Sequence, residues 1–369
     1  MLTPPVRAGV CAFYCALAAC SSGANKEPAP SQVAPKYSLD RPSEGLAQPA
    51  PRDASFRRGV SLDLYLAEVD EAQRAVYAGW LDQVSQLGAT DLELVVQWSQ
   101  LDAASLEIAP SATMTVDDEF FGWFMDQANQ HQLRVVVTPV LELEQVAPNE
   151  PAPSRTLAPA DSKRWFWNYH RFLLHYARIA EAHHAVGFAV GADLPDALLQ
   201  DETWPSLIKD VRKAYKGKLT YAARWDAFES VPFWDNLDEV TVTGVGELLA
   251  APAGAERDRR LAGLTQRLQA WNKDHGRPCL LSRTRVASSK APAPTADVRG
   301  SLEQLDAMRR VYQAPLQPES GVAGVYLSLA RPDGADRLGL PRVGSAAAGV
   351  VRHWYTRSRA PNTTAATLH

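Results

Sequence analysis

The chain has 369 residues, of which 46% are apolar and 22% are charged, which is close to the composition of an ordinary globular protein. Its net charge of −4 at pH 7 gives no electrostatic basis for a nucleic-acid partner, and no stretch after residue 20 is long and apolar enough to span a bilayer. The length allows one large α/β barrel of about 250 residues with extensions at its ends.

The first 20 residues have the pattern of a bacterial export signal. Arg7 supplies a positive charge, residues 8–19 form a short apolar run, and residues 17–20 read LAAC. This ending resembles the bacterial lipobox, in which the cysteine is lipidated and becomes the new N-terminus. We therefore expect residues 1–19 to be a lipoprotein signal peptide and Cys20 to carry a lipid. An ordinary secretory signal is the alternative.

Residues 20–54 are rich in proline, alanine and serine and have no hydrophobic periodicity. Such a segment cannot support a core and favours extended conformations, so it is typical of a tether between a membrane and a folded domain. Ser22 follows Cys20 at the second position, which by resemblance to that class of lipoprotein fits sorting to the outer membrane of a Gram-negative bacterium. The sequence predicts an envelope protein held by its lipid.

The four cysteines do not form a disulfide framework or a metal site. Three of them lie in the first 20 residues, and Cys279 lies in an apolar run, where a small buried hydrophobic side chain is the simpler interpretation. No metal-ligand spacing occurs in the sequence. We expect no metal and no other cofactor.

The clearest structural unit spans residues 165–194. Apolar residues recur at three- and four-residue steps, which predicts a helix with one broad apolar face, and Asp161 can cap its N-terminus. The apolar run at 185–190 then predicts a buried strand that ends at the carboxylate of Asp193. A helix, a buried strand and a carboxylate at the end of the strand form the unit of an α/β barrel.

The same alternation fills residues 55–357. Strands are expected at 59–64, 91–98, 133–141, 186–191, 218–223, 239–245, 278–282 and 322–329. Helices are expected at 69–87, 117–132, from 165, at 204–216, 255–275, 301–312 and 346–355, with a short helical piece at 233–237. Eight strands alternating with helices predict the α/β fold class and a (β/α)8 TIM barrel, followed by a disordered tail at 358–369. A doubly wound open sheet is the alternative, but no glycine-rich phosphate loop follows the first strand.

Function in such barrels lies at the C-terminal ends of the strands, so the polar and aromatic residues there are the candidates. Trp98 and Trp225 are candidate stacking platforms for sugar rings, with core packing as the alternative. Glu142 is a candidate carboxylate, although a solvated loop is the simpler interpretation. The candidate ligand-binding residues are Asp63, Trp98, Glu142, Asp193, Arg224, Trp225, Asp226 and Arg283.

Several ordered motifs resemble one enzyme family. They are RRGVSLD at 57–63, RFLLHYARIAE at 171–181, AVGFAVGADL at 185–194, LTYAARWD at 219–226, FWDNLD at 233–238 and GRPCLLS at 276–282. Together they resemble family 113 of the glycoside hydrolases, a clan A family of TIM barrels of the β-mannanase type. The resemblance runs from Phe56 to Tyr355 and implies retaining hydrolysis by two carboxylates, one after strand four and one after strand seven.

The catalytic positions that this resemblance implies are altered. The acid/base glutamate is expected in a Gly-Thr-Glu-Leu context, where this chain has Asp193, and the nucleophile in a Thr-Glu-Val-Gly context, where it has Arg283. A guanidinium stays protonated and offers only hydrogen-bond donors, so it cannot attack an anomeric carbon. The residues after strands five and six also differ from the family pattern, at Arg224 and at Gly244.

We therefore expect a membrane-anchored, glycoside-hydrolase-like barrel without hydrolytic activity, whose partner is a carbohydrate or an envelope protein. The alternatives are a retaining glycosidase that acts on β-mannan-like or other envelope polysaccharide with a non-standard carboxylate such as Glu142 or Asp226, and a purely structural envelope protein. Because strands four and seven face each other across the mouth of a clan A barrel, Asp193 and Arg283 are also predicted to approach within about 4 Å.

Overall fold

The computed structural model describes residues 55–145, 156–250, 255–286, 304–310, 320–334 and 340–357. The predicted signal peptide, the tether and the C-terminal tail lie outside these residues. Within them, no helix is long and apolar enough to cross a membrane.

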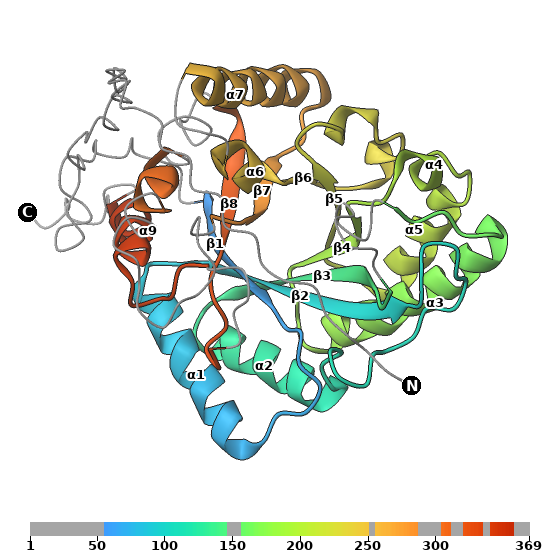
Figure 1. Cartoon of the computed structure of the whole chain (residues 1–369), viewed down its shortest axis with the longest axis horizontal. Coiled ribbons are helices and arrows are strands. Elements are labelled where there is room, and N and C mark those ends of the chain that lie inside the picture. The colour runs from blue at the N-terminus through green and yellow to red at the C-terminus, as the bar shows by residue number, and fades with distance from the viewer. Residues whose placement is uncertain are drawn as a thin grey trace, which may run out of the picture. The chain divides into compact units, whose positions relative to one another are not determined.

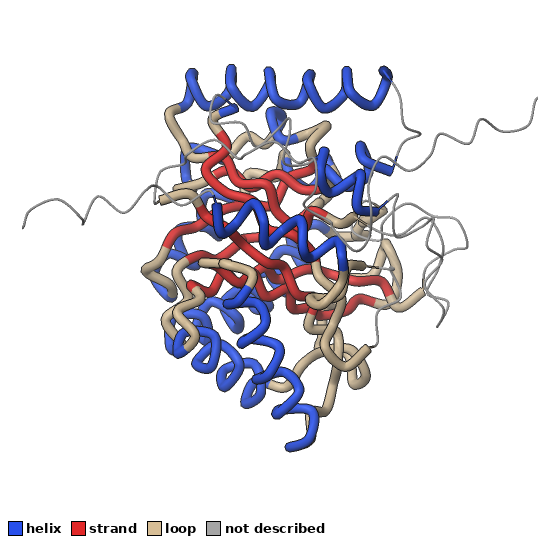
Figure 2. Tube along the Cα trace, turned by 90° about the vertical axis from the view of Figure 1, so that its left-hand side faces the viewer, coloured by secondary structure: helices blue, strands red, loops and turns tan. Residues whose placement is uncertain are grey.

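Eight parallel strands form a closed barrel in which each strand pairs with its neighbours in sequence and β8 pairs with β1. This confirms the predicted (β/α)8 barrel and excludes the open-sheet alternative. Figure 1 shows the strands at the centre, and Figure 2 shows the same arrangement from the side. The strands are β1 (Arg57–Asp63), β2 (Asp91–Gln100), β3 (Arg134–Leu143), β4 (Gly187–Ala192), β5 (Lys218–Arg224), β6 (Val240–Thr243), β7 (Cys279–Thr284) and β8 (Val322–Ser328).

Helices follow the strands and surround the barrel (Figures 1 and 2). They are α1 (Glu71–Gln86), α2 (Asp118–Gln130), α3 (Ser162–Ala182), α4 (Asp196–Leu199), α5 (Trp204–Ala214), α6 (Val245–Ala250), α7 (Ala255–His275) and α9 (Ala346–Arg357), with 3-10 turns η2 (Phe228–Ser230) and η3 (Trp234–Asn236). Residues 304–310 of the expected helix at 301–312 are helical. The short helices α4 and α6 were not predicted, because four and six residues are too few to show a helical period.

Side-chain caps fix the starts of α1 and α3. The carboxylate of Asp161 accepts a hydrogen bond from the backbone N–H of Arg164, which confirms the predicted cap of α3. Asp70 and Gln73 form a reciprocal capping box at the start of α1. The apolar face of α3 is buried from Trp165 to Ala180, so periodicity and cap together place this helix against the barrel.

The core has two parts, because each strand is buried on both faces. The larger part lies between strands and helices, and it includes the aromatic face of α3. Two smaller clusters lie inside the barrel, one of Val136, Leu280 and Tyr326 and one of Val95, Val140, Ala192 and Ala222 with Tyr65 packed against it. Cys279 is a buried free cysteine whose pKa is raised by burial to about 12, which confirms its interpretation as a small core residue.

Candidate functional site

The ends of β4 and β7 bring Asp193 and Arg283 together. The Nη1 atom of Arg283 lies 3.8 Å from the Oδ2 atom of Asp193, and the two side chains are 10% and 19% exposed. The predicted approach within about 4 Å is therefore confirmed. At this separation the pair is an ion pair and not the short bidentate bond that arginine forms with a well-placed carboxylate.

Both residues have a left-handed backbone, with φ of 51° at Asp193 and 45° at Arg283. Only glycine adopts this conformation freely, and other residues pay of order 1–3 kcal/mol, a cost that is concentrated at functional sites. The two strands therefore end in strained residues on opposite sides of the barrel mouth.

Asp193 also joins a third strand. Its Oδ1 atom accepts a hydrogen bond of 2.6 Å from the hydroxyl of Thr243, the last residue of β6, and its backbone N–H donates to the carbonyl of Ala222 in β5. One carboxylate thus contacts groups from β6 and β7, which holds it between the ends of these two strands.

Arg283 is held as a cation by its surroundings. Burial lowers the pKa of its guanidinium, but Tyr65, Asp63, Asp193 and Glu93 together raise it further, so the net pKa lies above the ordinary arginine value. Its Nε atom is buried and has no hydrogen-bond partner among the described residues. The group is therefore a fixed positive charge at the mouth, with hydrogen-bonding capacity left over.

A second group of charges lies beside it, where β1 and β3 end. Asp63 accepts a hydrogen bond of 2.8 Å from Arg285, and the hydroxyl of Tyr65 donates to Glu142 over 3.4 Å. Burial raises the pKa of Glu142, and Asp63 adds to this effect, while Arg283 and Arg285 oppose it. Glu142 is part of β3 and half-buried, so the simpler expectation of a solvated loop was wrong.

The third group follows β5 and β6. Arg224 binds both oxygens of Asp226 at 2.9 Å and also Glu247 at 2.8 Å, which places two carboxylates around one guanidinium. Gly244 has φ of 77°, and a Cβ atom there would lie 3.1 Å from the ring of Trp225. Trp225 therefore covers the end of β6, at the position where the family resemblance leads one to expect a tyrosine-bearing segment.

Trp98 does not join this site. Its ring packs against Phe172, His175 and Tyr176 of α3, on the helix side of β2. This placement agrees with the core-packing alternative and not with a platform for a sugar. Strand β2 is buried on both faces, so the sequence alone could not tell which of its residues point inward.

Glu93 is a site residue that the sequence analysis missed. It is 2% exposed inside the barrel, and its oxygens accept hydrogen bonds from the hydroxyls of Ser61, Thr138 and Ser282 on three different strands. The available signal was a glutamate within the apolar run DLELVV, where an unpaired charge would be costly. Glu93 adds a buried negative charge that also acts on Arg283.

Among the described residues, no group of three or more histidine, cysteine, aspartate or glutamate side chains is arranged to hold a metal ion. The mouth therefore consists of arginines and carboxylates from β1, β3, β4, β5 and β7. The sequence-predicted site residues other than Trp98 lie at this end of the barrel, with Asp63, Glu142, Asp193 and Arg283 in one set of interacting charges and Arg224 and Asp226 in another.

Comparisons with known proteins point to one family. The family model of Glycoside Hydrolase Family 113 matches residues 71–294, which is more than half of the chain. No curated protein sequence matches the chain.

Among solved structures, a GH113 β-1,4-mannanase is similar with a TM-score of 0.65, 21% identity, and coverage of 82% of this chain and 99% of its own. The GH113 β-mannanase of Alicyclobacillus acidocaldarius, in complex with ManMIm, has a TM-score of 0.65, 21% identity, and coverage of 82% and 98%. A family 5 mannosidase from Rhizomucor miehei has a TM-score of 0.59 and 10% identity over 82% of this chain and 93% of its own. At these identities the structural similarities concern the fold.

Proposed function

We propose that this chain, which belongs to glycoside hydrolase family 113, binds a saccharide at its barrel mouth without hydrolysing it. Retaining glycosidases need two carboxylates about 5–5.5 Å apart, one that acts as acid and base and one that attacks the anomeric carbon. By the family resemblance, these two positions are Asp193 and Arg283 in this chain.

The observation that carries the proposal is the charge at the second position. Arg283 is buried, held as a cation by its neighbours, and 3.8 Å from Asp193. It has no electron pair to donate to an anomeric carbon, and its positive charge opposes an oxocarbenium-like transition state. The ion pair also occupies the space between the ends of β4 and β7 where two catalytic carboxylates would stand.

Binding of a saccharide is supported by hydrogen-bonding capacity that the mouth does not use. The Oδ1 atom of Asp63, the Nε atom of Arg283 and the Nε1 atom of Trp225 are buried and have no partner among the described residues. Sugar hydroxyls both donate and accept, and an indole face suits the apolar face of a sugar ring. These atoms are buried in the structure, so binding requires side-chain movement.

The test uses manno-oligosaccharides and soluble β-mannan as probes. We expect saturable binding, with no release of reducing ends above background. Trp225→Ala should weaken binding at least tenfold, whereas the control Trp167→Ala, which removes a 61% exposed tryptophan of α3, should leave it unchanged. Absence of saccharide binding would contradict the proposal and favour an envelope protein as the partner or a structural role.

A second candidate function is hydrolysis by a non-standard carboxylate, and the raised pKa of Glu142 is the observation that favours it. A raised pKa keeps a carboxyl protonated up to a higher pH than usual, which favours a role as a general acid. If the wild-type protein releases reducing sugar and Glu142→Gln abolishes that release, this candidate is correct. Asp226 is less suited to the role, since Arg224 binds both of its oxygens.

Restoring the family pattern tests the inactive positions directly. The double variant Asp193→Glu/Arg283→Glu replaces the ion pair with two glutamates at the ends of β4 and β7. Recovered hydrolysis would mean that the rest of the site still supports catalysis. A double variant that folds but shows no hydrolysis would agree with further losses of catalytic groups, at the positions of Arg224 and Gly244.

The proposal includes a lipid anchor at Cys20 and a location in the cell envelope, at the outer membrane of a Gram-negative bacterium. The sequence LAAC after an apolar run supports it, and these residues lie outside the described part of the chain. Labelled fatty acid should appear on the wild-type protein, and Cys20→Ser should release the protein from the membrane fraction without unfolding the barrel. Absence of label on the wild-type protein would refute the anchor.

A further inference from the structure

The N-terminal end of the barrel, opposite the mouth, holds a basic pocket. A cavity of about 450 Å³ lies there, and five of its lining residues are cations, against a single lining carboxylate, Asp238. The cations come from β1, β3, α5, the α5–β5 connection and β5, and they are Arg57, Arg134, Arg212, Lys216 and Lys218. Three of them are the first residues of their strands, so the barrel itself sets their positions.

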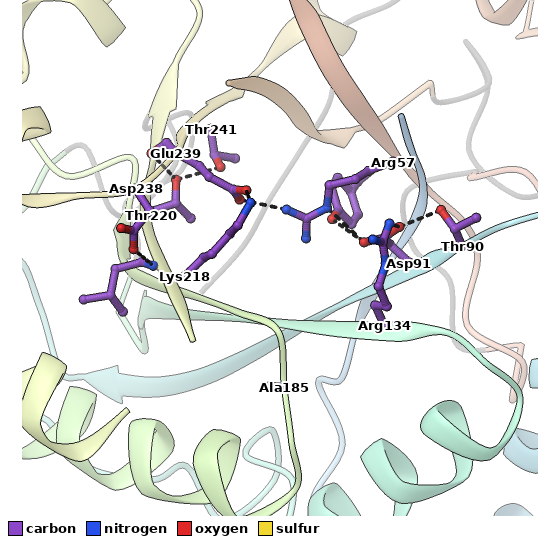
Figure 3. Close-up of polar contacts among 12 residues, drawn as sticks. Arg57, Thr90, Asp91, Arg134, Ala185, Lys218, Thr220, Asp238, Glu239 and Thr241 are labelled. Atoms are coloured by element: carbon purple, nitrogen blue, oxygen red, sulfur yellow. Dashed lines mark hydrogen bonds and ion pairs between the residues drawn. The ribbon is translucent and has the colours of Figure 1, made fainter. Parts of the chain in front are cut away.

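Arg57 is the buried base of this pocket. Its side chain is 9% exposed, its Nε atom donates to Asp91 over 2.9 Å, and its Nη1 atom donates to Glu239 over 2.7 Å. Its Nη2 atom is buried and has no hydrogen-bond partner among the described residues. In Figure 3 this third nitrogen points away from both carboxylates, toward the space between Lys218 and Arg134.

The other cations keep donors available above Arg57. Arg134 pairs with Asp91 at 2.6 Å and Lys218 pairs with Glu239 at 2.5 Å, yet their side chains remain 47% and 58% exposed. Guanidinium and ammonium groups carry five and three N–H donors, so one carboxylate contact leaves most of them unused. In Figure 3 the two side chains reach the carboxylate partners of Arg57 from β3 and β5, on either side of its guanidinium.

The α5 side of the pocket adds uncompensated charge. Arg212 pairs with Asp238 at 2.7 Å, but the ammonium of Lys216 donates to the backbone carbonyls of Arg212 and Lys213. Glu181 is the acceptor for the backbone N–H of Lys216. The five lining cations are thus in contact with four carboxylates, Asp91, Asp238, Glu239 and Glu181, which leaves a net charge of +1.

We propose that this pocket binds a phosphate group. A phosphate offers several oxygens to donors that converge from different elements, and arginine is suited to bind it by two parallel hydrogen bonds. The Nη2 atom of Arg57 is buried, and it would obtain the partner that it lacks once the side chain turns toward the phosphate. A purely structural network would brace the strand ends equally well without an unpartnered Arg57 nitrogen and without Lys216.

The phosphate can come from two sources, a free phosphate compound or the headgroup of a membrane lipid. β1 begins at Arg57, so the segment that precedes the barrel joins it at the same end as the pocket. The chemistry of binding is the same for both sources, and the experiment separates them.

The test uses the full chain carrying Cys20→Ser, which removes the proposed acylation site, and inorganic phosphate as the first probe. Calorimetric titration should give saturable binding when ionic strength is matched with sodium chloride. Lys216→Gln/Lys218→Gln should weaken this binding at least tenfold. The control Lys209→Gln/Lys213→Gln removes the same charge from the same region, at residues that do not line the pocket, and should leave the affinity within twofold.

The second probe is a phosphatidylcholine vesicle with and without phosphatidic acid. Phosphate binding together with sedimentation on phosphatidic acid vesicles, and competition between the two probes, would identify the lipid headgroup as the source. Phosphate binding without vesicle binding would identify a free phosphate compound. No saturable phosphate binding, equal loss in both double variants, or vesicle binding without phosphate binding would each overturn the proposal.

Discussion

The two ends of the barrel both contain arginine–carboxylate pairs, and one pair at the mouth, Asp193–Arg283, differs from the N-terminal contacts in distance and in backbone conformation. At the N-terminal end, the contacts among Arg57, Asp91, Arg134, Lys218 and Glu239 measure between 2.5 and 2.9 Å. At the mouth, Asp193 and Arg283 are 3.8 Å apart. The N-terminal network begins at residues that open regular strands, whereas the mouth pair is carried by two residues with left-handed backbones.

We interpret this difference as one of role: the N-terminal contacts stabilise the fold, and the Asp193–Arg283 pair lies at a position related to function. The buried carboxylate of Asp91 accepts hydrogen bonds from Arg57, Arg134 and Tyr326, so its charge is well compensated in place. Asp193 and Arg283 are farther apart than the N-terminal pairs, and their backbones are strained. Both features are typical of a position shaped by chemistry and not by folding. In this chain the strain persists, although the residues at both positions differ from those of the family pattern.

The largest effect is expected at the N-terminal end. Asp91→Ala should lower the free energy of unfolding by about 3–5 kcal/mol, because it leaves two arginines without their shared buried partner. Chemical denaturation followed by circular dichroism measures it. The control Asp226→Ala removes a 43% exposed carboxylate from an arginine at the mouth and should cost less than about 1 kcal/mol. Equal effects of the two variants would contradict the contrast drawn between the two ends.

An intermediate effect is expected for the mouth pair. Asp193→Ala should cost about 2 kcal/mol, because it removes the nearest carboxylate from buried Arg283 and the acceptor for Thr243. Asp193→Asn keeps the shape and tolerates the left-handed backbone, so the difference between the two variants separates charge from strain. A double-mutant cycle with Arg283→Met should give a coupling of about 1 kcal/mol, and zero coupling would show that the pair is not an interaction.

The smallest effect is expected at Glu142 and depends on pH. A carboxyl whose pKa is raised in the folded state binds its proton more tightly when folded. The stabilisation of the folded state by protonated Glu142 is fully present below about pH 4.3, the ordinary pKa of glutamate. It is lost as the pH rises through the pKa of Glu142 in the folded state. Glu142→Gln stays neutral, so its melting temperature should exceed that of the wild type at pH 7 and approach it near pH 4. A constant difference across this range would contradict the raised pKa.

Sequence reasoning was most successful where local pattern decides the structure. The apolar spacing in residues 165–180 and the cap at Asp161 predicted α3, and the approach of Asp193 to Arg283 followed from barrel topology. It left Trp98 undecided between a sugar platform and core packing, because a strand buried on both faces has no polar alternation that reveals which side chains point inward. The network around Glu93 was also missed, since its three hydroxyl donors come from strands distant in sequence.

The sequence by itself determined the order of the elements, the barrel, the family resemblance and the residue types at the strand ends, because these depend on short-range periodicity and on motifs. Only the tertiary structure decided which of those side chains meet, how far apart they lie and which donors remain unpaired. Arg57, Arg134 and Lys218 show the reason. They are far apart in the chain, and their charges act together only because closure of the barrel brings the starts of their strands to one end, where they share the buried carboxylates of Asp91 and Glu239.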